Sequence, residues 1–189
     1  KSHALAALAL LKDSKTAATC LLGAAVFASI YIFATFLPIV FHESYGLSST
    51  YIGLAFLLSG IMLLAGTFIG GRLSDKSDRK KVFISGAFIA FISVLLSAFW
   101  ADALYPLIAA YALFGFGTGL FFPAARVYVI ERTHLSASAN GAFNFSLFTA
   151  ATIAPIAGGM IIENYNYFTL FFVASSLILV MVFVALRKT

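Results

Sequence analysis

The sequence predicts an all-α membrane protein with six transmembrane helices. Two observations lead to this fold class: 62% of the 189 residues are hydrophobic while only 10% are charged, and the apolar residues gather in six long runs. A soluble domain usually carries about 25% charged residues, so it does not fit this composition. A membrane-spanning helix needs about 20 predominantly apolar residues, and every run is close to or above that length.

None of the six runs contains an Asp, Glu, Lys, Arg or His. They cover Thr16–Phe41, Tyr51–Gly71, Val82–Trp100, Ala103–Ala125, Ala137–Ile162 and Tyr167–Leu186. The alternating pattern of a transmembrane β-barrel is absent, and apolar runs this long satisfy their backbone groups in lipid only as helices. We therefore expect a six-helix bundle over residues 16–189, preceded by a cytoplasmic lead-in or linker over residues 1–15.

The positive charges predict the orientation of the helices. All twelve Lys and Arg residues lie before the first run, between the second and third, between the fourth and fifth, or after the sixth: Lys1, Lys12, Lys15, Arg72, Lys76, Arg79, Lys80, Lys81, Arg126, Arg132, Arg187 and Lys188. Lys and Arg are retained on the cytoplasmic side, so both termini are expected there. The net charge of +5 is then explained by topology and anionic lipid, without nucleic acid.

The sequence contains no pattern for catalysis or cofactor binding. Cys20 is the single cysteine and lies inside a run, so no disulfide framework or CxxC metal site is expected. An intramembrane enzyme would need a nucleophile with a base, or paired acids, within the spans, and none is present. We expect no enzymatic activity, no metal and no bound cofactor. A channel is not favoured either, because no filter motif or ring of charge is present.

Small residues collect within two of the runs and predict close helix packing. They are Gly115, Gly117 and Gly119 in the fourth run, and Pro155, Gly158 and Gly159 in the fifth. Glycine lets helix backbones approach closely in a membrane, and a proline can bend a helix where neighbours satisfy the freed carbonyl.

A charged string, Gly71 to Lys81, connects the second and third runs and is the most specific pattern in the chain. It resembles motif A of the major facilitator superfamily, G-x-L-x-D-R/K-x-G-R/K-R/K. The matching positions are Gly71, Leu73, Asp75, Lys76, Arg79 and Lys80, whereas Asp78 stands where the family usually has Gly. The resemblance implies a conformational latch at Gly71, Asp75, Lys76, Arg79 and Lys80. In the family the acidic residue of the motif meets a neighbouring helix end and basic partners, and the resemblance assigns Asp75 and Arg79 to that role.

The resemblance also implies the architecture and the activity. Six helices with short connections are similar to one half of the twelve-helix family fold, whose halves alternate access to a central cavity. The implied function is secondary active transport, by proton-coupled export of a small amphipathic or drug-like solute, in a bacterial plasma (inner) membrane. Partners would be protons, lipid, the solute, and the other six-helix half or a second copy. Tyr111 replaces the exporter Arg before Gly115 and Gly117, and Ala154 the first Gly of G-P-x-x-G-G, which favours the C-terminal half.

Uncharged polar residues within the runs are candidates for a solute cavity. They are Tyr31 and Thr35, Tyr111, and Asn140 and Asn144. Spacings of four residues place Tyr31 with Thr35, and Asn140 with Asn144, on one helix face. A hydrogen bond to a neighbouring helix is the alternative for each. A further alternative for the whole chain is a structural or assembly subunit, or a self-pairing half-transporter without its own coupling site.

Overall fold

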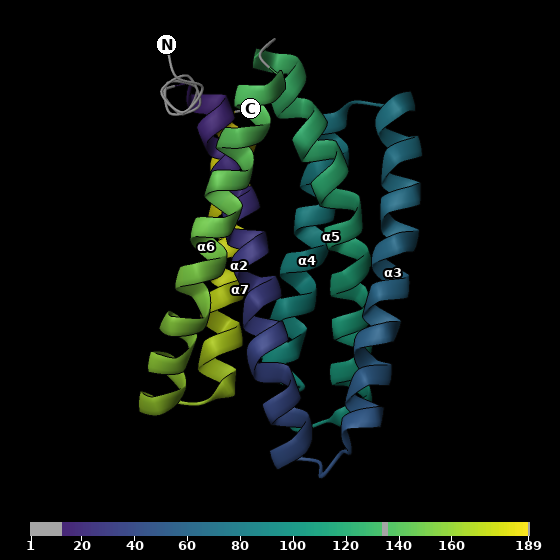
Figure 1. Cartoon of the computed structure of the whole chain (residues 1–189), viewed down its shortest axis with the longest axis vertical. Coiled ribbons are helices and arrows are strands. Elements are labelled where there is room, and N and C mark those ends of the chain that lie inside the picture. The colour runs from purple at the N-terminus through teal and green to yellow at the C-terminus, as the bar shows by residue number, and fades with distance from the viewer. Residues whose placement is uncertain (1–12, 134–135, 189) are drawn as a thin grey trace.

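The computed structural model describes residues 13–133 and 136–188, and within them it contains six long helices and no strand (Figure 1). The helices are α2 (Ser14–Glu43), α3 (Ser49–Lys76), α4 (Arg79–Phe99), α5 (Leu104–Thr133), α6 (Ser136–Asn164) and α7 (Tyr167–Lys188). All six are long and apolar enough to cross a membrane. The predicted fold class is therefore confirmed, and the chain is a multi-pass membrane protein.

The helices run up and down, so that alternate connections share one end of the bundle. The start of α2, the α3–α4 connection, the end of α5 and the end of α7 lie together (Figure 1). Every described Lys and Arg lies at this end or within about two helical turns of it, so we call it the basic end. Glu43, Asp102 and Glu163 lie at the opposite end. The separation of charge predicted from the sequence is thus present in three dimensions.

The bundle consists of two interlocked groups of three helices. In the first group α5 packs against α3 and α4, and in the second α2 packs against α6 and α7; α4 and α7 join the groups. Thus α5, from the second half of the chain, packs against two helices of the first half, and α2, from the first half, packs against two helices of the second. Because α2 starts at the basic end and α5 at the opposite end, residues 14–99 and 104–188 are related as an inverted repeat of three helices.

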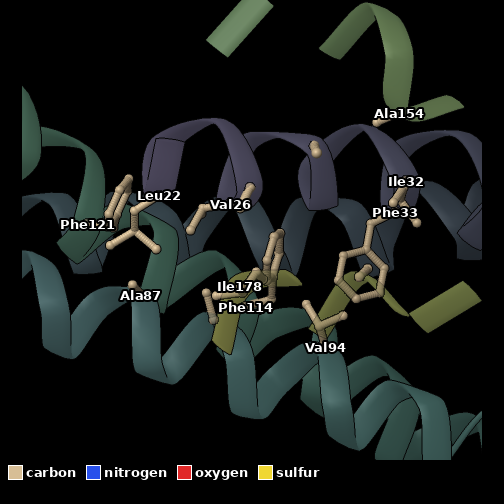
Figure 2. Close-up of a cluster of buried hydrophobic side chains, with 14 of the residues drawn as sticks. Leu22, Val26, Ile32, Phe33, Ala87, Val94, Phe114, Phe121, Ala154 and Ile178 are labelled. Atoms are coloured by element: carbon tan, nitrogen blue, oxygen red, sulfur yellow. The ribbon is translucent and has the colours of Figure 1, made fainter. Parts of the chain in front are cut away.

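Bulky side chains fill the space between the two groups. Leu22, Val26 and Phe33 of α2 face Ala87 and Val94 of α4, Phe114 and Phe121 of α5, and Ile178 of α7 (Figure 2). Phe33 is fully buried, and its ring lies 5.3 Å, 4.8 Å and 5.2 Å from the rings of Tyr111, Phe114 and Phe171. Aromatic pairs at these distances stabilise a core beyond the area that they bury.

The backbone of α5 contacts the backbones of α3 and α4 directly, through glycines. A Cβ atom on Gly66 of α3 would overlap the carbonyl oxygen of Phe116, and one on Gly119 would lie 2.8 Å from the amide nitrogen of Thr67. On the other side of α5, a Cβ on Gly117 would lie 2.8 Å from the amide nitrogen of Ala90. A larger residue at any of these positions would force two helices apart.

Two boundaries differ from the sequence-based interpretation. The connection within the string from Gly71 to Lys81 is shorter than the sequence predicted, because α3 continues to Lys76 and α4 begins at Arg79. Asp78 caps α4 by accepting a hydrogen bond from the Lys80 amide at 2.9 Å. Similarly, α5 does not end at Ala125 but continues to Thr133, so Arg126 lies inside a helix. Charged residues ended the apolar runs without ending the helices.

At the opposite end, a tyrosine ties two connections together. The Tyr45 hydroxyl, just after α2, donates a hydrogen bond of 2.6 Å to the carbonyl oxygen of Ala101, between α4 and α5. Burial, and secondly the nearby Asp102 carboxylate, raise the pKa of Tyr45 above its usual value of 10.0. The neutral hydroxyl is therefore the form that the folded protein favours.

We expect Gly66→Ala to destabilise the bundle, because the new methyl group meets the backbone of α5. Overpacking of this kind costs about 1–3 kcal/mol. Gly60→Ala is the matched control on the same helix, since a Cβ there meets no atom within 4 Å and alanine favours a helix by about 1 kcal/mol. Thermal unfolding of the detergent-solubilised protein measures both, and equal melting temperatures would contradict the glycine contact.

We expect the hydrogen bond from Tyr45 to Ala101 to stabilise the folded protein in a pH-dependent way. Tyr45→Phe removes one hydrogen bond, at a cost of about 0.5–1.5 kcal/mol. Because the folded pKa is raised, the contribution of Tyr45 is fully present below pH 10 and is lost as the pH rises through the folded pKa. Melting temperatures should therefore fall as the pH rises above 10 in the wild type and fall less in Tyr45→Phe. Parallel curves for the two proteins would show that the bond does not contribute.

Candidate functional site

An aromatic and polar surface, formed by α2, α5 and α6, is the best candidate for a binding site. Phe27 of α2 lies at its centre, with ring centroids at 5.3 Å from Tyr31, 5.6 Å from Phe122 and 5.7 Å from Phe148. Phe122 and Phe148 meet Phe27 edge to face. These three helices therefore present a continuous aromatic patch.

One helical turn from this aromatic patch toward the basic end, α5 and α6 carry polar groups. Arg126 follows Phe122 by four residues on α5, and Asn144 precedes Phe148 by four residues on α6, so each pair shares a helix face. The Arg126 guanidinium donates a hydrogen bond of 3.3 Å from Nη2 to the Asn144 amide oxygen. We call these six residues the wall: Phe27, Tyr31, Phe122, Arg126, Asn144 and Phe148.

A pocket of about 260 Å³ adjoins the wall between α3 and α5. Arg126, Phe122 and Thr67 line it, together with Leu63, Thr118, Gly119 and Pro123. The Thr118 hydroxyl is already bonded to the carbonyl oxygens of Phe114 and Gly115, at 3.0 and 2.9 Å. The polar groups that the pocket can offer to a ligand are thus the Arg126 guanidinium and the Thr67 hydroxyl.

The candidates for a solute cavity fall into two sets. Tyr31 and Asn144 belong to the wall, and Thr35 is exposed one turn beyond Tyr31 on α2. Asn140 lies one turn from Asn144, and its buried amide oxygen has no hydrogen-bond partner among the described residues. Tyr111, by contrast, is 9% exposed and packs in the core between Phe33 and Phe56. The structure therefore brings four candidates to one side and leaves Tyr111 as a packing residue.

Sequence reasoning did not include Arg126 among the candidates, because its charge was assigned to a connection. The signal that could have found it is the apolar stretch that follows, Val127–Ile130, which is typical of a helix that continues. Arg126 is exposed on the bundle surface, about two turns before α5 ends.

The motif-like string supplies a second set of functional candidates at the basic end. Arg79, the first residue of α4, forms a salt bridge with Glu131 near the end of α5. Asp75 and Lys76 are exposed in the last turn of α3, and Lys80 is half-buried. No described residue bonds the Asp75 carboxylate, and a Cβ on Gly71 would meet no atom within 4 Å. In this bundle Asp75 and Gly71 therefore face open surface.

The remaining predicted packing residues lie on α6, except Gly115, which lies on α5. A Cβ on Gly158 would overlap the ring of Phe36, whereas one on Gly159 would meet nothing within 4 Å. Pro155 lies inside α6 and is half-buried. Gly115, like Gly119, approaches α3, where the Ser59 hydroxyl donates a 3.0 Å hydrogen bond to the carbonyl oxygen of Tyr111.

A larger pocket of about 670 Å³ lies between α2, α6 and α7. Its lining is almost entirely aliphatic, with Ser146 and Thr149 as hydroxyl-bearing members. Both hydroxyls donate to carbonyl oxygens of α6, those of Phe143 and Phe145. Because a specific site needs a few convergent polar groups, this groove is a weaker candidate than the wall. Among the described residues no group of His, Cys, Asp and Glu is arranged to hold a metal ion.

Fold and site together define a polytopic membrane protein whose helix bundle has a pocket of about 260 Å³ beside an aromatic and polar surface. The chain belongs to the Major Facilitator Superfamily, whose sequence model matches residues 19–189. The family membership that the string at Gly71 to Lys80 indicated is thereby confirmed.

Curated relatives agree with this membership. The chain is 33% identical over 100 residues to multidrug resistance protein D of Escherichia coli (strain K12), covering 51% of this chain and 25% of that protein. It is 26% identical to a Na(+), Li(+), K(+)/H(+) antiporter of Planococcus maritimus, covering 77% and 35%. It is 28% identical to the multidrug transporter protein MdtP of Bacillus subtilis (strain 168), covering 75% and 26%. The chain matches only about a quarter to a third of each relative's length.

We expect the Arg79–Glu131 pair to stabilise the contact between α4 and α5 modestly. Both side chains are partly exposed, at 26% and 58%, and exposed pairs contribute about 0.2–1 kcal/mol. Arg79→Glu and Glu131→Arg should each lower the melting temperature, and the double exchange should restore part of the loss. The restoration should shrink in 1 M salt, because salt screens exposed charges. Additive losses in the double variant would contradict the pairing.

Proposed function

We propose that the chain is one six-helix half of a secondary active transporter that exports a small amphipathic solute in exchange for protons. The observation that carries the proposal is the family match over residues 19–189 together with the wall in the same bundle. Relatives named as a multidrug resistance protein, a multidrug transporter protein and a cation/proton antiporter support export and proton coupling. They also support transport rather than an enzymatic reaction.

In this proposal the wall faces a central cavity whose other side is built by a second six-helix unit. That unit is the rest of the same polypeptide or a second copy. We assign the present bundle to the C-terminal half, because Tyr111 and Ala154 occupy positions where exporter motifs carry Arg and Gly. The basic end faces the cytoplasm of a bacterial cell, in agreement with the positive-inside rule.

The conformational latch of the proposal is built from the motif-like string. Asp75 is exposed in the last turn of α3 and has no partner among the described residues, so it is available to contact the other half. The Arg79 salt bridge to Glu131 holds the start of α4 beside α5. Lys76 and Lys80 add positive charge, and Gly71 leaves space for a closely approaching helix. The latch would close the basic end in one state of the cycle.

The latch is tested by Asp75→Asn in the full-length protein, reconstituted in vesicles with an outward-facing basic end. We expect the variant to insert normally and to exchange protons for an amphipathic solute at least about tenfold more slowly, since a charged hydrogen bond contributes about 1.5–3 kcal/mol. Solute-induced collapse of an imposed pH gradient measures the exchange.

Glu163→Gln is the matched control, because Glu163 is an exposed carboxylate at the opposite end. It should exchange at the wild-type rate. Unchanged transport in Asp75→Asn would remove the latch from the proposal, whereas a wild-type protein that never couples solute to protons would remove proton-coupled export itself.

A further inference from the structure

We propose that Arg126 and Thr67 form a subsite for the negative charge of an amphipathic anion, such as an aromatic carboxylate. This inference rests on the proposed function and deepens it, because it names the class of solute. It is carried by the placement of Arg126 at the junction of the wall and the 260 Å³ pocket.

The Arg126 guanidinium retains hydrogen-bond donors for a ligand. A guanidinium has five N–H donors, and one bond, from Nη2 to Asn144 at 3.3 Å, is the hydrogen bond that Arg126 makes among the described residues. That bond restrains the side chain on the face it shares with Phe122. The remaining donors are available to a carboxylate, which an arginine binds with two parallel hydrogen bonds. Thr67 supplies a hydroxyl from the α3 side of the same pocket.

The positive charge of Arg126 is not neutralised by any described residue. Glu131 lies five residues further along α5, but it is paired with Arg79. No other salt bridge is formed among the described residues, so Asn144 holds the Arg126 charge without neutralising it. An ionisable residue within a membrane bundle is costly and usually faces a pathway for ions or solutes. A bound anion would neutralise this cation, whereas a cationic solute would be repelled.

An apolar surface lies beside the charge of Arg126. Leu63, Phe122 and Pro123 line the pocket around Arg126, and Phe27 continues the surface from Phe122 toward Phe148. A solute with its carboxylate on Arg126 would lay its hydrophobic body on these rings, directed away from the basic end. The site thus fits an amphipathic monoanion better than a sugar, an inorganic ion or an organic cation.

A matched pair of probes tests the proposal. We would measure equilibrium binding of radiolabelled 1-naphthaleneacetate and 1-naphthaleneacetamide to the full-length protein in nanodiscs made of zwitterionic lipid. The two compounds share their ring system and differ in charge. We expect the acid to bind at least about tenfold more tightly, as charge-assisted hydrogen bonds are roughly twice as strong as neutral ones. Equal affinities, or tighter binding of the amide, would overturn the proposal.

Three variants locate the effect. Arg126→Gln should abolish the preference for the acid and leave the affinity of the amide unchanged, and Arg126→Lys should retain part of the preference. Arg187→Gln removes a cation from the end of α7, away from the wall, and should behave as the wild type. A preference that survives in Arg126→Gln would place the anion elsewhere and refute the subsite. If the glutamine variant does not fold, an undiminished preference in Arg126→Lys would refute it, because lysine lacks the two parallel donors of the guanidinium.

Transport is measured separately from binding. Preferential binding of the acid without proton-coupled flux would retain the anion subsite and reject the proposed export. Proton-coupled flux of the amide, with no preference for the acid in binding, would retain the transporter and reject the subsite.

Discussion

The backbone contact between α5 and its two neighbours is the constraint on which the rest of the bundle depends. The hydrophobic effect contributes little to helix association in lipid, so van der Waals packing at small residues must hold the helices together. Gly66 and Gly119 bring α3 onto one side of α5, and Gly86 and Gly117 bring α4 onto the other. With two sides of α5 covered, the side that carries Phe122 and Arg126 is left to meet α2 and α6.

The second group of helices lacks such a backbone seam. Gly23 of α2 contacts the side chains of Phe143 and Leu147, and Gly158 of α6 contacts the ring of Phe36. Side chains rather than backbones therefore set the distance between α2 and α6, and α7 contacts α6 only weakly. The 670 Å³ aliphatic groove is the space that results. The inverted repeat is thus closely packed in one group and loosely packed in the other.

The sequence was sufficient for the fold, whereas it could not define which of its polar residues share one surface. Apolar length and the placement of Lys and Arg predicted six helices and a common basic end, because each signal extends over many residues. Spacing alone could not separate Tyr31, which lies on the wall, from Tyr111, which lies between Phe33 and Phe56. That distinction depends on which face each helix buries, and the helices are apolar on all sides. Arg126 was missed because a charge ends an apolar window whether or not the helix ends there.

Arg79 and Arg126 differ in the residue that each contacts, and this difference gives the first a structural role and the second a proposed role in binding. Arg79 is neutralised by a carboxylate at an exposed helix end, where an ion pair adds little to stability but fixes the position of α4 beside α5. Arg126 is held by the neutral amide of Asn144, which restrains its geometry and leaves its positive charge without a carboxylate partner among the described residues. A carboxylate at position 144 would have bound Arg126 more strongly and cancelled the field at the pocket. The asparagine therefore gives the wall an oriented positive charge, which is the property that a binding site for an anion requires.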